Sequence, residues 1–424
     1  MISYDKALKT LVTYAAKQQD WLKVRECHPE ESVGRILAKD LYSEETLPAF
    51  TSSAMDGYGI SWADGNACEN FAETFFEVVG ESAAGKPFSK GLEPGLNQAC
   101  RIMTGALVPP QADTVIKVEH SDRETHKAGF VRFTELPRSG ANIRQAGEDL
   151  PKGRKIAGAG QKIGAKEILL FASLGIRNVP VFADFSVDIV STGSELCEGG
   201  KAPDVHRGQI RNSTKPFLET TLKNFGLNDV TVSSVSDQPD EMIRHFRQVL
   251  SRNPSLILTT GGVSAGKYDY LPSVVKDLGG EILFHKVAIR PGKPVLVAYF
   301  ADRPEGPPTM LFCLPGNPVS TMTGFQFFVN PYLRRLFNQS GEAGISLPLL
   351  EPVANESGLT RFVRASATRG DDGRLSVKPL PQQGSHMVGQ LSFMNCWIQL
   401  SPGQKFIQKG ENVMIRFQDH PDFI

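Results

Sequence analysis

Between residues 181 and 333 the chain alternates short apolar runs with amphipathic stretches, and this alternation constrains the fold more than any other feature. Six runs have strand length and strand-forming residues: 186–190, 229–233, 256–258, 282–284, 295–298 and 310–313. Helical periodicity separates the first three, over 214–225, which ends at Gly226, and over 239–250. The pattern predicts a doubly wound, mainly parallel α/β sheet with helices on both faces.

Three glycine-rich turns close apolar runs within this region. Ser255-Leu-Ile-Leu-Thr-Thr-Gly-Gly262 leads a strand into paired glycines, and Asp269 follows. Arg290-Pro-Gly-Lys-Pro294 and Leu314-Pro-Gly-Asn-Pro318 are the other two turns. Glycines after a strand free backbone N–H groups, so each turn can form an anion cradle at the carboxyl end of a strand. A single turn of this kind is usually only a connection between strands. Three of them predict a shared pocket.

The regions on either side have other periodicities. Ser3 precedes an amphipathic helix that it can cap, and a second helix over 168–174 stops at Gly175. Short strands separated by Gly, Pro and Asn over 53–139 predict a β-rich insertion. From residue 341 to 424 similar strands predict a small C-terminal β-barrel or sandwich.

Composition limits the classes of function. Lys plus Arg and Asp plus Glu are balanced at 46 each in 424 residues, which argues against bulk attraction to nucleic acid or an anionic membrane and favours a small anionic ligand. The six cysteines form no Cys-x-x-Cys pair, so we expect reduced thiols. The N-terminus has no leader pattern, and no apolar run is long enough to span a bilayer, so we expect a cytoplasmic protein.

Acidic residues occupy five predicted loop positions: Asp56, Asp149, Glu195, Asp237 and Asp269. Mg²⁺ binds through one or two carboxylates together with substrate phosphates, so acids on loops that face a phosphate cradle are candidate ligands. Not all five can be ligands, and a loop acid is often only a turn residue or a helix cap.

Basic residues form a second group of candidates. If 284–290 is extended, its period of two places Lys286, Ala288 and Arg290 on one face, with Lys293 just beyond the Pro-Gly turn. Such a group could bind an oxyanion, or it could be an ordinary solvated face. Arg144 could bind phosphate or pair with a carboxylate.

One set of motifs comprises Thr260-Gly-Gly-Val-Ser264 with Asp269, Arg290-Pro-Gly-Lys-Pro294 and Leu314-Pro-Gly-Asn-Pro-Val-Ser320. These motifs closely resemble those of the molybdopterin molybdenumtransferase (MoeA) family, which is related to the E domain of gephyrin. Ser53-Ala-Met-Asp-Gly-Tyr58, Met103-Thr-Gly-Ala106 with Ala112-Asp-Thr114, and Asn142-Ile-Arg-Gln-Ala-Gly-Glu-Asp149 are similar to the N-terminal motifs of that family, in the same order. Gln383-Gly-Ser-His386 resembles a motif whose serine touches the site. The resemblance covers nearly the whole chain.

The resemblance implies four domains: a discontinuous, elongated N-terminal domain (1–52 and 140–180), an inserted β-rich domain (53–139), an α/β molybdopterin-binding domain (181–333) and a C-terminal β-barrel (341–424). It also implies a reaction, in which molybdate is inserted into adenylylated molybdopterin and Mg²⁺-dependent hydrolysis releases AMP and molybdenum cofactor. The expected partners are these two substrates and a second copy in a homodimer, whose cleft joins the α/β domain of one subunit to the N-terminal domain of the other. A transient contact with the adenylyltransferase and other cofactor-biosynthesis proteins is compatible with it.

Residue types and resemblance together give the candidate site. Its catalytic candidates are Asp56, Asp149, Asp269, Lys286, Arg290 and Lys293. Its substrate-binding candidates are Thr104, Arg144, Thr260, Gly261, Gly262, Ser264, Pro315, Pro318 and Ser385. Its metal-ligand candidates are Glu195, Asp237 and Asp269.

Two positions depart from the family pattern. Ser194 stands where the family usually has an aspartate, which lowers the local negative charge, and Arg290 replaces a lysine found in some relatives. An arginine is a planar fork rather than a point charge, so it binds an anion with different geometry. Two other functions stay open: a molybdopterin adenylyltransferase built on the same α/β domain, and a scaffold that retains only the pterin-binding fold.

Overall fold

The computed structural model describes residues 1–122, 128–183, 185–197, 208–263, 270–301 and 306–418. Its backbone forms two compact units. The first comprises Met1–Lys39, Ala159–Gly164 and Val179–Ile424, and the second comprises Asp40–Gly158 and Ala165–Asn178. Each unit is described separately.

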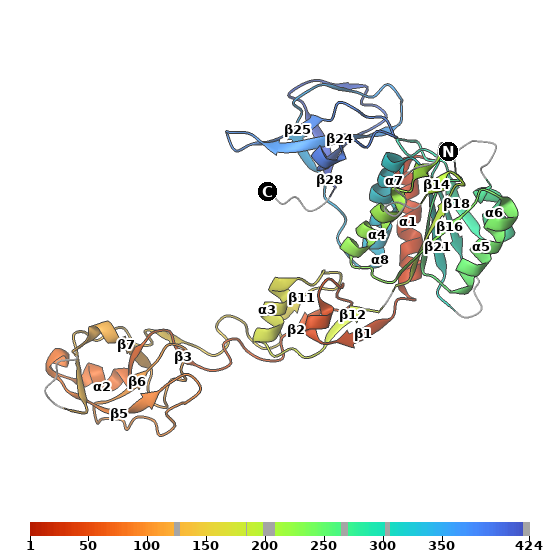
Figure 1. The fold of residues 1–424 in the computed structure, drawn as a ribbon. Coiled ribbons are helices and arrows are strands. Elements are labelled where there is room, and N and C mark those ends of the chain that lie inside the picture. The colour runs from red at the N-terminus through yellow and green to blue at the C-terminus, as the bar shows by residue number, and fades with distance from the viewer. Residues whose placement is uncertain (123–127, 184, 198–207, 264–269, 302–305, 419–424) are drawn as a thin grey trace. The chain divides into compact units, whose positions relative to one another are not determined.

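A six-stranded mixed sheet forms the centre of the first unit (Figure 1). Its strands, in sheet order, are β16 (Val230–Val235), β13 (Val187–Thr192), β17 (Leu256–Thr260), β21 (Thr309–Leu314), β20 (Leu296–Phe300) and β18 (Glu281–His285). The first four run parallel, and β20 and β18 are antiparallel to their neighbours. All six apolar runs of the 181–333 region are therefore strands, and the sheet is mainly parallel as predicted.

Helices cover both faces of this sheet (Figure 1). On β17, Leu256 and Leu258 pack into one hydrophobic core and Ile257 packs into the other, which is the alternation expected of a doubly covered strand. Helices α1 (Tyr4–Gln19), α4 (Thr214–Phe225) and α8 (Asn330–Leu336) contribute to the first core. Helices α5 (Pro239–Ser251) and α6 (Leu271–Asp277) contribute to the second.

The predicted helix boundaries hold where their capping residues are clear. The Ser3 hydroxyl accepts a hydrogen bond from the backbone N–H of Lys6 and so caps α1. Helix α4 ends at Gly226, whose φ of 112° lies in the left-handed region that favours glycine. Helix α1 packs onto the α/β core, where the Gln18 side chain donates to the carbonyls of Ser255 and Pro308 at 2.7 Å each.

A second six-stranded sheet forms the C-terminal part of this unit. Five strands follow one another in the order β19 (Ile289–Arg290), β24 (Thr360–Arg369), β26 (Cys396–Leu400), β28 (Asn412–Phe417) and β22 (Ile345–Pro348). The sixth, β25 (Leu375–Pro379), pairs with β24. A bridge between Leu349 and Val377 links the segment after β22 to β25, so the sheet is nearly closed. Strand β19 comes from the loop after β18 and thus ties this sheet to the α/β part.

The remaining strands and α-helix of the first unit are short. They are β1 (Val24–Cys27), β12 (Val179–Phe182), β14 (Leu196–Cys197), β15 (Ile210–Arg211), α7 (Pro318–Gly324), β23 (Val353–Ala354) and β27 (Phe406–Ile407). Between α7 and α8 the helix widens into a π-helical segment, Phe325–Val329.

The second unit contains the predicted β-rich insertion. Its main sheet has the order β7 (Thr114–Lys117), β4 (Gly57–Ile60), β6 (Gln98–Ile102), β5 (Phe76–Ser82), β9 (Phe130–Phe133) and β8 (Ser121–Asp122). The other strands and the α-helices of this unit are β2 (Leu41–Tyr42), β3 (Ser52–Ser53), α2 (Trp62–Ala67), β10 (Ile143–Arg144), β11 (Lys155–Ala157) and α3 (Ala165–Ser173). A core around Phe76 and Phe133 lies under the sheet.

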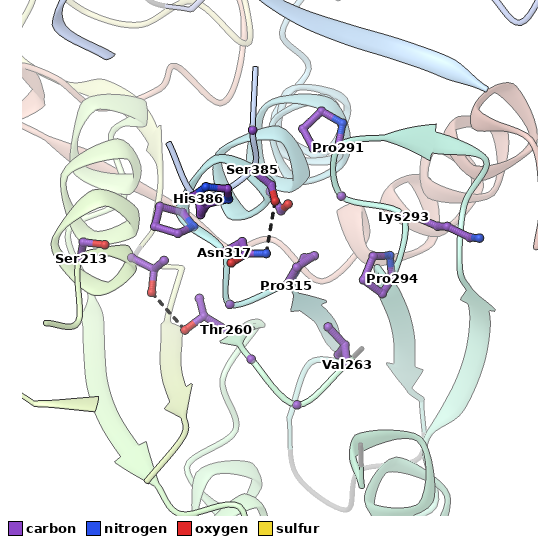
Figure 2. A pocket seen from close by; sticks show the side chains of 18 of the residues that line it. Ser213, Thr260, Val263, Pro291, Lys293, Pro294, Pro315, Asn317, Ser385 and His386 are labelled. Carbon is purple, nitrogen blue, oxygen red and sulfur yellow. Dashed lines mark hydrogen bonds between the residues drawn. The ribbon is translucent and has the colours of Figure 1, made fainter. Parts of the chain in front are cut away.

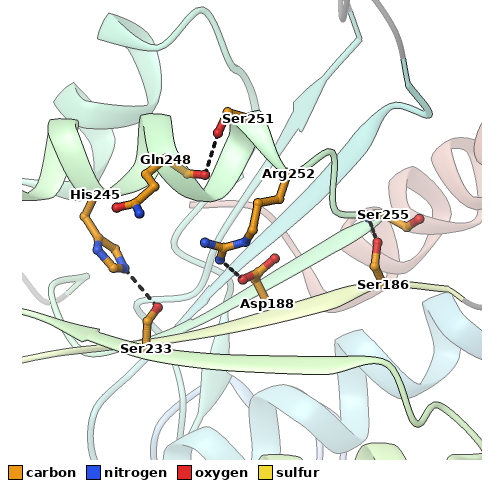
Figure 3. Close-up of polar contacts among 8 residues, drawn as sticks. All are labelled: Ser186, Asp188, Ser233, His245, Gln248, Ser251, Arg252 and Ser255. Atoms are coloured by element: carbon orange, nitrogen blue, oxygen red, sulfur yellow. Dashed lines mark hydrogen bonds and ion pairs between the residues drawn. The ribbon is translucent and has the colours of Figure 1, made fainter.

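A polar cluster lies between α5 and the strands β13 and β16 (Figure 3). Asp188, with 3% of its surface exposed, forms an ion pair with Arg252, and His245 Nε2 lies 2.9 Å from Ser233 Oγ. Burial raises the pKa of Asp188, and Arg252 opposes that effect. Burial also lowers the pKa of His245, and Arg252 adds to that effect.

All six cysteines are free thiols, as predicted. Among the described residues, no helix combines the length and the apolar character that a membrane crossing requires.

Candidate functional site

A cavity of about 1160 Å³ lies where β13, β17 and β21 end. The carboxyl ends of parallel strands meet at one edge of a sheet, and this edge is the usual ligand site of such folds. Its walls come from the turns after these strands, from the 290–294 turn, and from residues of the nearly closed sheet and its 383–386 loop. The three glycine-rich turns noted in the sequence therefore line one pocket (Figure 2).

Backbone atoms of the glycine-rich turns form part of the cavity wall. Gly261 and Gly262 have φ values of 91° and 67°, and a Cβ on Gly261 would lie 2.5 Å from the carbonyl oxygen of Thr192. A Cβ on Gly316 would lie 3.5 Å from the Cα of Gly261. Only glycine at 261 lets the β17 and β13 turns approach this closely while keeping a left-handed backbone.

Hydroxyl and amide side chains line the wall beside the start of α4. The Thr214 hydroxyl lies 3.2 Å from Thr260 Oγ1, and the Asn212 amide donates to Ser191 Oγ at 2.9 Å. Asn212 Oδ1 accepts from the backbone N–H of Lys215 at 3.2 Å. The N-terminus of α4 carries a partial positive charge, so this wall suits an anionic group such as a phosphate.

Cations dominate the charged side chains of the cavity. Arg211, Arg290, Lys293 and Arg361 line it, and Glu195 is the acidic residue among its described lining residues. Arg290 and Arg361 are register partners on the parallel strands β19 and β24. Burial, and secondly the charge of Arg290, lower the pKa of Arg361. Two guanidinium groups placed side by side repel each other, and a bound anion would relieve that repulsion.

Ser385 reaches the pocket from the C-terminal part of the unit. Its hydroxyl accepts a hydrogen bond from the Asn317 amide at 3.3 Å (Figure 2). Its carbonyl accepts one from the backbone N–H of Val319 at 3.2 Å. The 383–386 loop is thereby attached to the turn between β21 and α7.

Most of the sequence-predicted residues of the first unit meet in this cavity. They are Glu195, Thr260, Gly261, Gly262, Arg290, Lys293, Pro315, Pro318 and Ser385. Asp237 is partly buried in the loop after β16 and is not among the lining residues. Ser264 and Asp269 lie outside the described residues.

The expected continuous strand over 284–290 is wrong. Strand β18 ends at His285, Lys286 adopts a left-handed φ of 67°, and β19 contains only Ile289 and Arg290. The Lys286 N–H bonds the carbonyl of Val295 at 2.9 Å, and its own carbonyl accepts from Ile2 at 3.1 Å. These bonds turn the chain, so Lys286 and Arg290 do not share a strand face, and Lys286 is not among the lining residues.

Four predicted residues belong to the second unit. The Asp56 carboxylate accepts hydrogen bonds from the backbone N–H of Thr104 at 2.7 Å and from its hydroxyl at 2.9 Å. These bonds, the backbone one first, lower the pKa of Asp56. Arg144 is exposed at the end of β10, and Asp149 is exposed in the following turn. The structure thus joins Asp56 to Thr104, two candidates from separate motifs.

The described residues offer few metal ligands. No group of three or more His, Cys, Asp or Glu side chains converges within the described ranges. Glu195 and Asp237 follow the carboxyl ends of β13 and β16, which pair in parallel through Thr192 and Val235. Two carboxylates on neighbouring loops are compatible with Mg²⁺ that takes its other ligands from substrate oxygens and water.

The sequence interpretation missed several lining residues. Arg361 lies outside the motifs found in the sequence, and only the pairing of β19 with β24 brings it beside Arg290. Asn212 and Thr214 could have been noticed as a capping pattern before α4, although nothing local shows that they face a pocket.

Comparison with known proteins decides the family. The sequence models for the MoeA N-terminal region (domain I and II), a probable molybdopterin binding domain, and the MoeA C-terminal region (domain IV) match residues 2–175, 188–335 and 346–416. A molybdopterin molybdenumtransferase from Synechococcus elongatus is 35% identical over 98% of this chain and 99% of its own length. The chain belongs to the MoeA family. A molybdopterin molybdenumtransferase from Bacillus subtilis is 30% identical over 98% of this chain and 93% of its own length.

Solved MoeA structures have the same fold. A molybdopterin biosynthesis MoeA protein from Pyrococcus matches with a TM-score of 0.81 and 25% sequence identity, covering 99% of this chain and all of the other. The likeness to MoeA proteins thus holds for both sequence and backbone.

Proposed function

We propose that this chain is a molybdopterin molybdenumtransferase that inserts molybdate into adenylylated molybdopterin and hydrolyses the phosphoanhydride, releasing AMP and molybdenum cofactor. One observation carries the proposal: among its described lining residues, the cavity joins three glycine-rich turns with four Lys or Arg side chains and one acidic side chain. Both proposed substrates are anions, one of them with phosphates and the other an oxyanion. Family membership supplies the reaction class.

The cavity offers different groups to the two anions. The backbone of Gly261 and Gly262, with the hydroxyls of Thr260 and Thr214, forms a neutral wall beside the α4 N-terminus that would bind phosphate. Arg290, Lys293 and Arg361, with the Ser385 hydroxyl, would bind molybdate and stabilise the charge that develops on the leaving phosphate. Pro315 and Pro318 restrict the turn between them, so the wall is preorganised.

Glu195 and Asp237, together with Asp269, would hold Mg²⁺. When bound, Mg²⁺ neutralises phosphate charge and polarises a phosphoryl oxygen. We also propose that Asp56, Asp149, Thr104 and Arg144 serve the reaction from the second unit of a partner in a cytoplasmic homodimer, as the family resemblance implies.

The proposal is tested by incubating the pure protein with adenylylated molybdopterin, molybdate and Mg²⁺. Activation of an apo-molybdoenzyme added to the mixture would report the molybdenum cofactor formed, and we expect activation that requires molybdate. A parallel incubation with molybdopterin and ATP tests the adenylyltransferase alternative. Adenylylated pterin formed from ATP, with no product in the first incubation, would overturn the proposal.

A further inference from the structure

Arg364 is an unusual buried charge in the nearly closed sheet. It lies in the middle of β24, and only 1% of its surface is exposed. None of the ion pairs found among the described residues includes it. A buried guanidinium is costly unless its N–H groups are satisfied, so its partners should show its role.

The partners are three carbonyl oxygens of one loop. Its guanidinium donates to the carbonyls of Gln382, Gly384 and Met387. Five N–H groups in a planar fork suit this task, because one side chain can reach several acceptors at fixed angles. Burial lowers the pKa of Arg364.

The side chain of Gln383 binds the same loop to the Arg364 backbone. Its Oε1 accepts from the Arg364 N–H at 3.0 Å, and its Nε2 donates to the carbonyls of Arg364 at 2.9 Å and Leu380 at 2.7 Å. The loop over 382–387 is therefore attached to β24 through both the side chain and the backbone of one residue.

This loop carries Ser385 and His386 to the cavity wall, where the Ser385 hydroxyl accepts from Asn317 (Figure 2). The Ser385 carbonyl also accepts from the backbone N–H of Val319. Arg364 itself is not among the lining residues. We propose that Arg364 is a positioning residue that holds loop 382–387 so that the Ser385 hydroxyl faces the anion beside Arg290 and Lys293. The kinetic consequence rests on the proposed function, whereas the effect on the loop does not.

The first test is independent of activity. In Arg364→Lys a single ammonium nitrogen replaces the two guanidinium nitrogens that contact the three carbonyls, so these hydrogen bonds cannot all keep their geometry. Hydrogen exchange at the Val319 amide, which donates to the Ser385 carbonyl, should then accelerate about tenfold. Arg416→Lys is the control, because Arg416 lies in the same sheet and bonds Gln399 and the Glu342 carbonyl instead. Exchange at Val319 that is unchanged in folded Arg364→Lys overturns the proposal.

The second test is a double-mutant cycle with Ser385→Ala, read as KM for molybdate and KM for the adenylylated pterin. If Arg364 acts through Ser385, Arg364→Lys raises KM for molybdate about tenfold and adds little to a chain that already carries Ser385→Ala. Additive effects, or equal changes in both KM values, overturn the proposal.

If Arg364→Lys does not fold, a second variant tests the same proposal. Gln383→Ala loosens the same loop while it keeps the guanidinium, so the same changes in exchange and in molybdate KM are expected, and their absence overturns the proposal. If the wild-type protein makes no molybdate-dependent product, the proposed function fails, and the Val319 exchange still decides the role of Arg364.

Discussion

At the scale of single residues, Gly261 shows how closely the backbone controls the cavity. It combines a left-handed φ of 91° with a Cβ position 2.5 Å from the Thr192 carbonyl oxygen. Gly279 has a similar φ of 78° but no atom within 4 Å of its Cβ position. Replacing each glycine with alanine therefore measures two different costs. At Gly279 the cost comes from the left-handed backbone alone, and at Gly261 a steric clash is added.

Gly279→Ala should lower the free energy of unfolding by roughly 1–2 kcal/mol, the cost of a left-handed alanine. Gly261→Ala should lower it by a further ~1–3 kcal/mol, because the added methyl group forces the β13 and β17 turns apart. Urea denaturation measures both. Equal losses in the two variants would show that the close approach at Gly261 has no energetic consequence.

Thr104 should control the ionisation of Asp56. Thr104→Val removes the hydroxyl donor and keeps the backbone N–H, so the pKa of Asp56 should rise toward its ordinary range, while Thr104→Ser should leave it nearly unchanged. Carbon-13 NMR titration of the Asp56 carboxyl group measures this shift. A pKa that falls or stays constant in Thr104→Val would contradict the role of the hydroxyl.

Site residues could be predicted from the sequence where the local sequence itself shows their role. The glycines, prolines, Arg290 and Lys293 could be predicted because each stands in a turn whose backbone requirements appear in the sequence itself. Arg361 could not, because it faces the cavity only through the pairing of β19 with β24, two strands distant in sequence. The break in the expected strand over 284–290 was not predictable, because Lys286 has a left-handed φ of 67° that non-glycine residues rarely adopt.

At the scale of elements, the α/β part was predictable because its strands are short apolar or alternating runs and its helices show amphipathic periodicity, with a glycine stop after α4. The mixed order at β20 and β18 was not, since apolar runs do not reveal strand direction. In the C-terminal region the pattern of short strands did not distinguish a β-barrel from a β-sandwich. The bridge between Leu349 and Val377 shows a nearly closed sheet.

The contact between α5 and β16 makes stability depend on pH through His245 (Figure 3). Its pKa is lowered in the folded state, first by burial and then by Arg252, while Asp188 acts in the opposite direction. A lowered folded pKa means that the unfolded chain binds the proton more readily. The stability contribution of neutral His245 is therefore complete above about pH 6.5 and is lost as pH falls through the folded pKa.

His245→Gln cannot titrate but can still bond Ser233. The difference in free energy of unfolding between wild type and His245→Gln should therefore shrink, or reverse against the wild type, as pH falls from 8 to 5. Chemical denaturation at several pH values measures it. A difference that is constant over this range would contradict the role assigned to His245.

At the scale of the whole molecule, the candidate residues fall into two units, with the cavity in the first and the Asp56–Thr104 pair in the second. The domain boundaries at 52, 139, 180 and 341 and the shared cleft stay predictions from the family resemblance.

A hybrid dimer tests the shared cleft. If each site combines the first unit of one chain with the second unit of its partner, pairing Asp56→Asn with Lys293→Ala leaves one site intact and one doubly damaged. Co-expression forms about half hybrids, so roughly a quarter of wild-type activity should return from two nearly inactive parents. With hybrids confirmed by differential tags, activity no greater than the sum of the parents would indicate that each chain builds its own site.

In the proposed function, the cationic cavity couples molybdenum insertion to phosphoanhydride hydrolysis. Quantifying AMP and inserted molybdenum in one reaction, with limiting adenylylated molybdopterin, tests it most directly. We predict about one AMP for each molybdenum inserted. We also predict that Lys293→Ala loses at least about tenfold of both, equivalent to ~1.4 kcal/mol of transition-state stabilisation, while Lys276→Ala on the exposed surface of α6 loses neither. Unequal amounts of AMP and inserted molybdenum, or wild-type amounts of both in Lys293→Ala, would contradict the account.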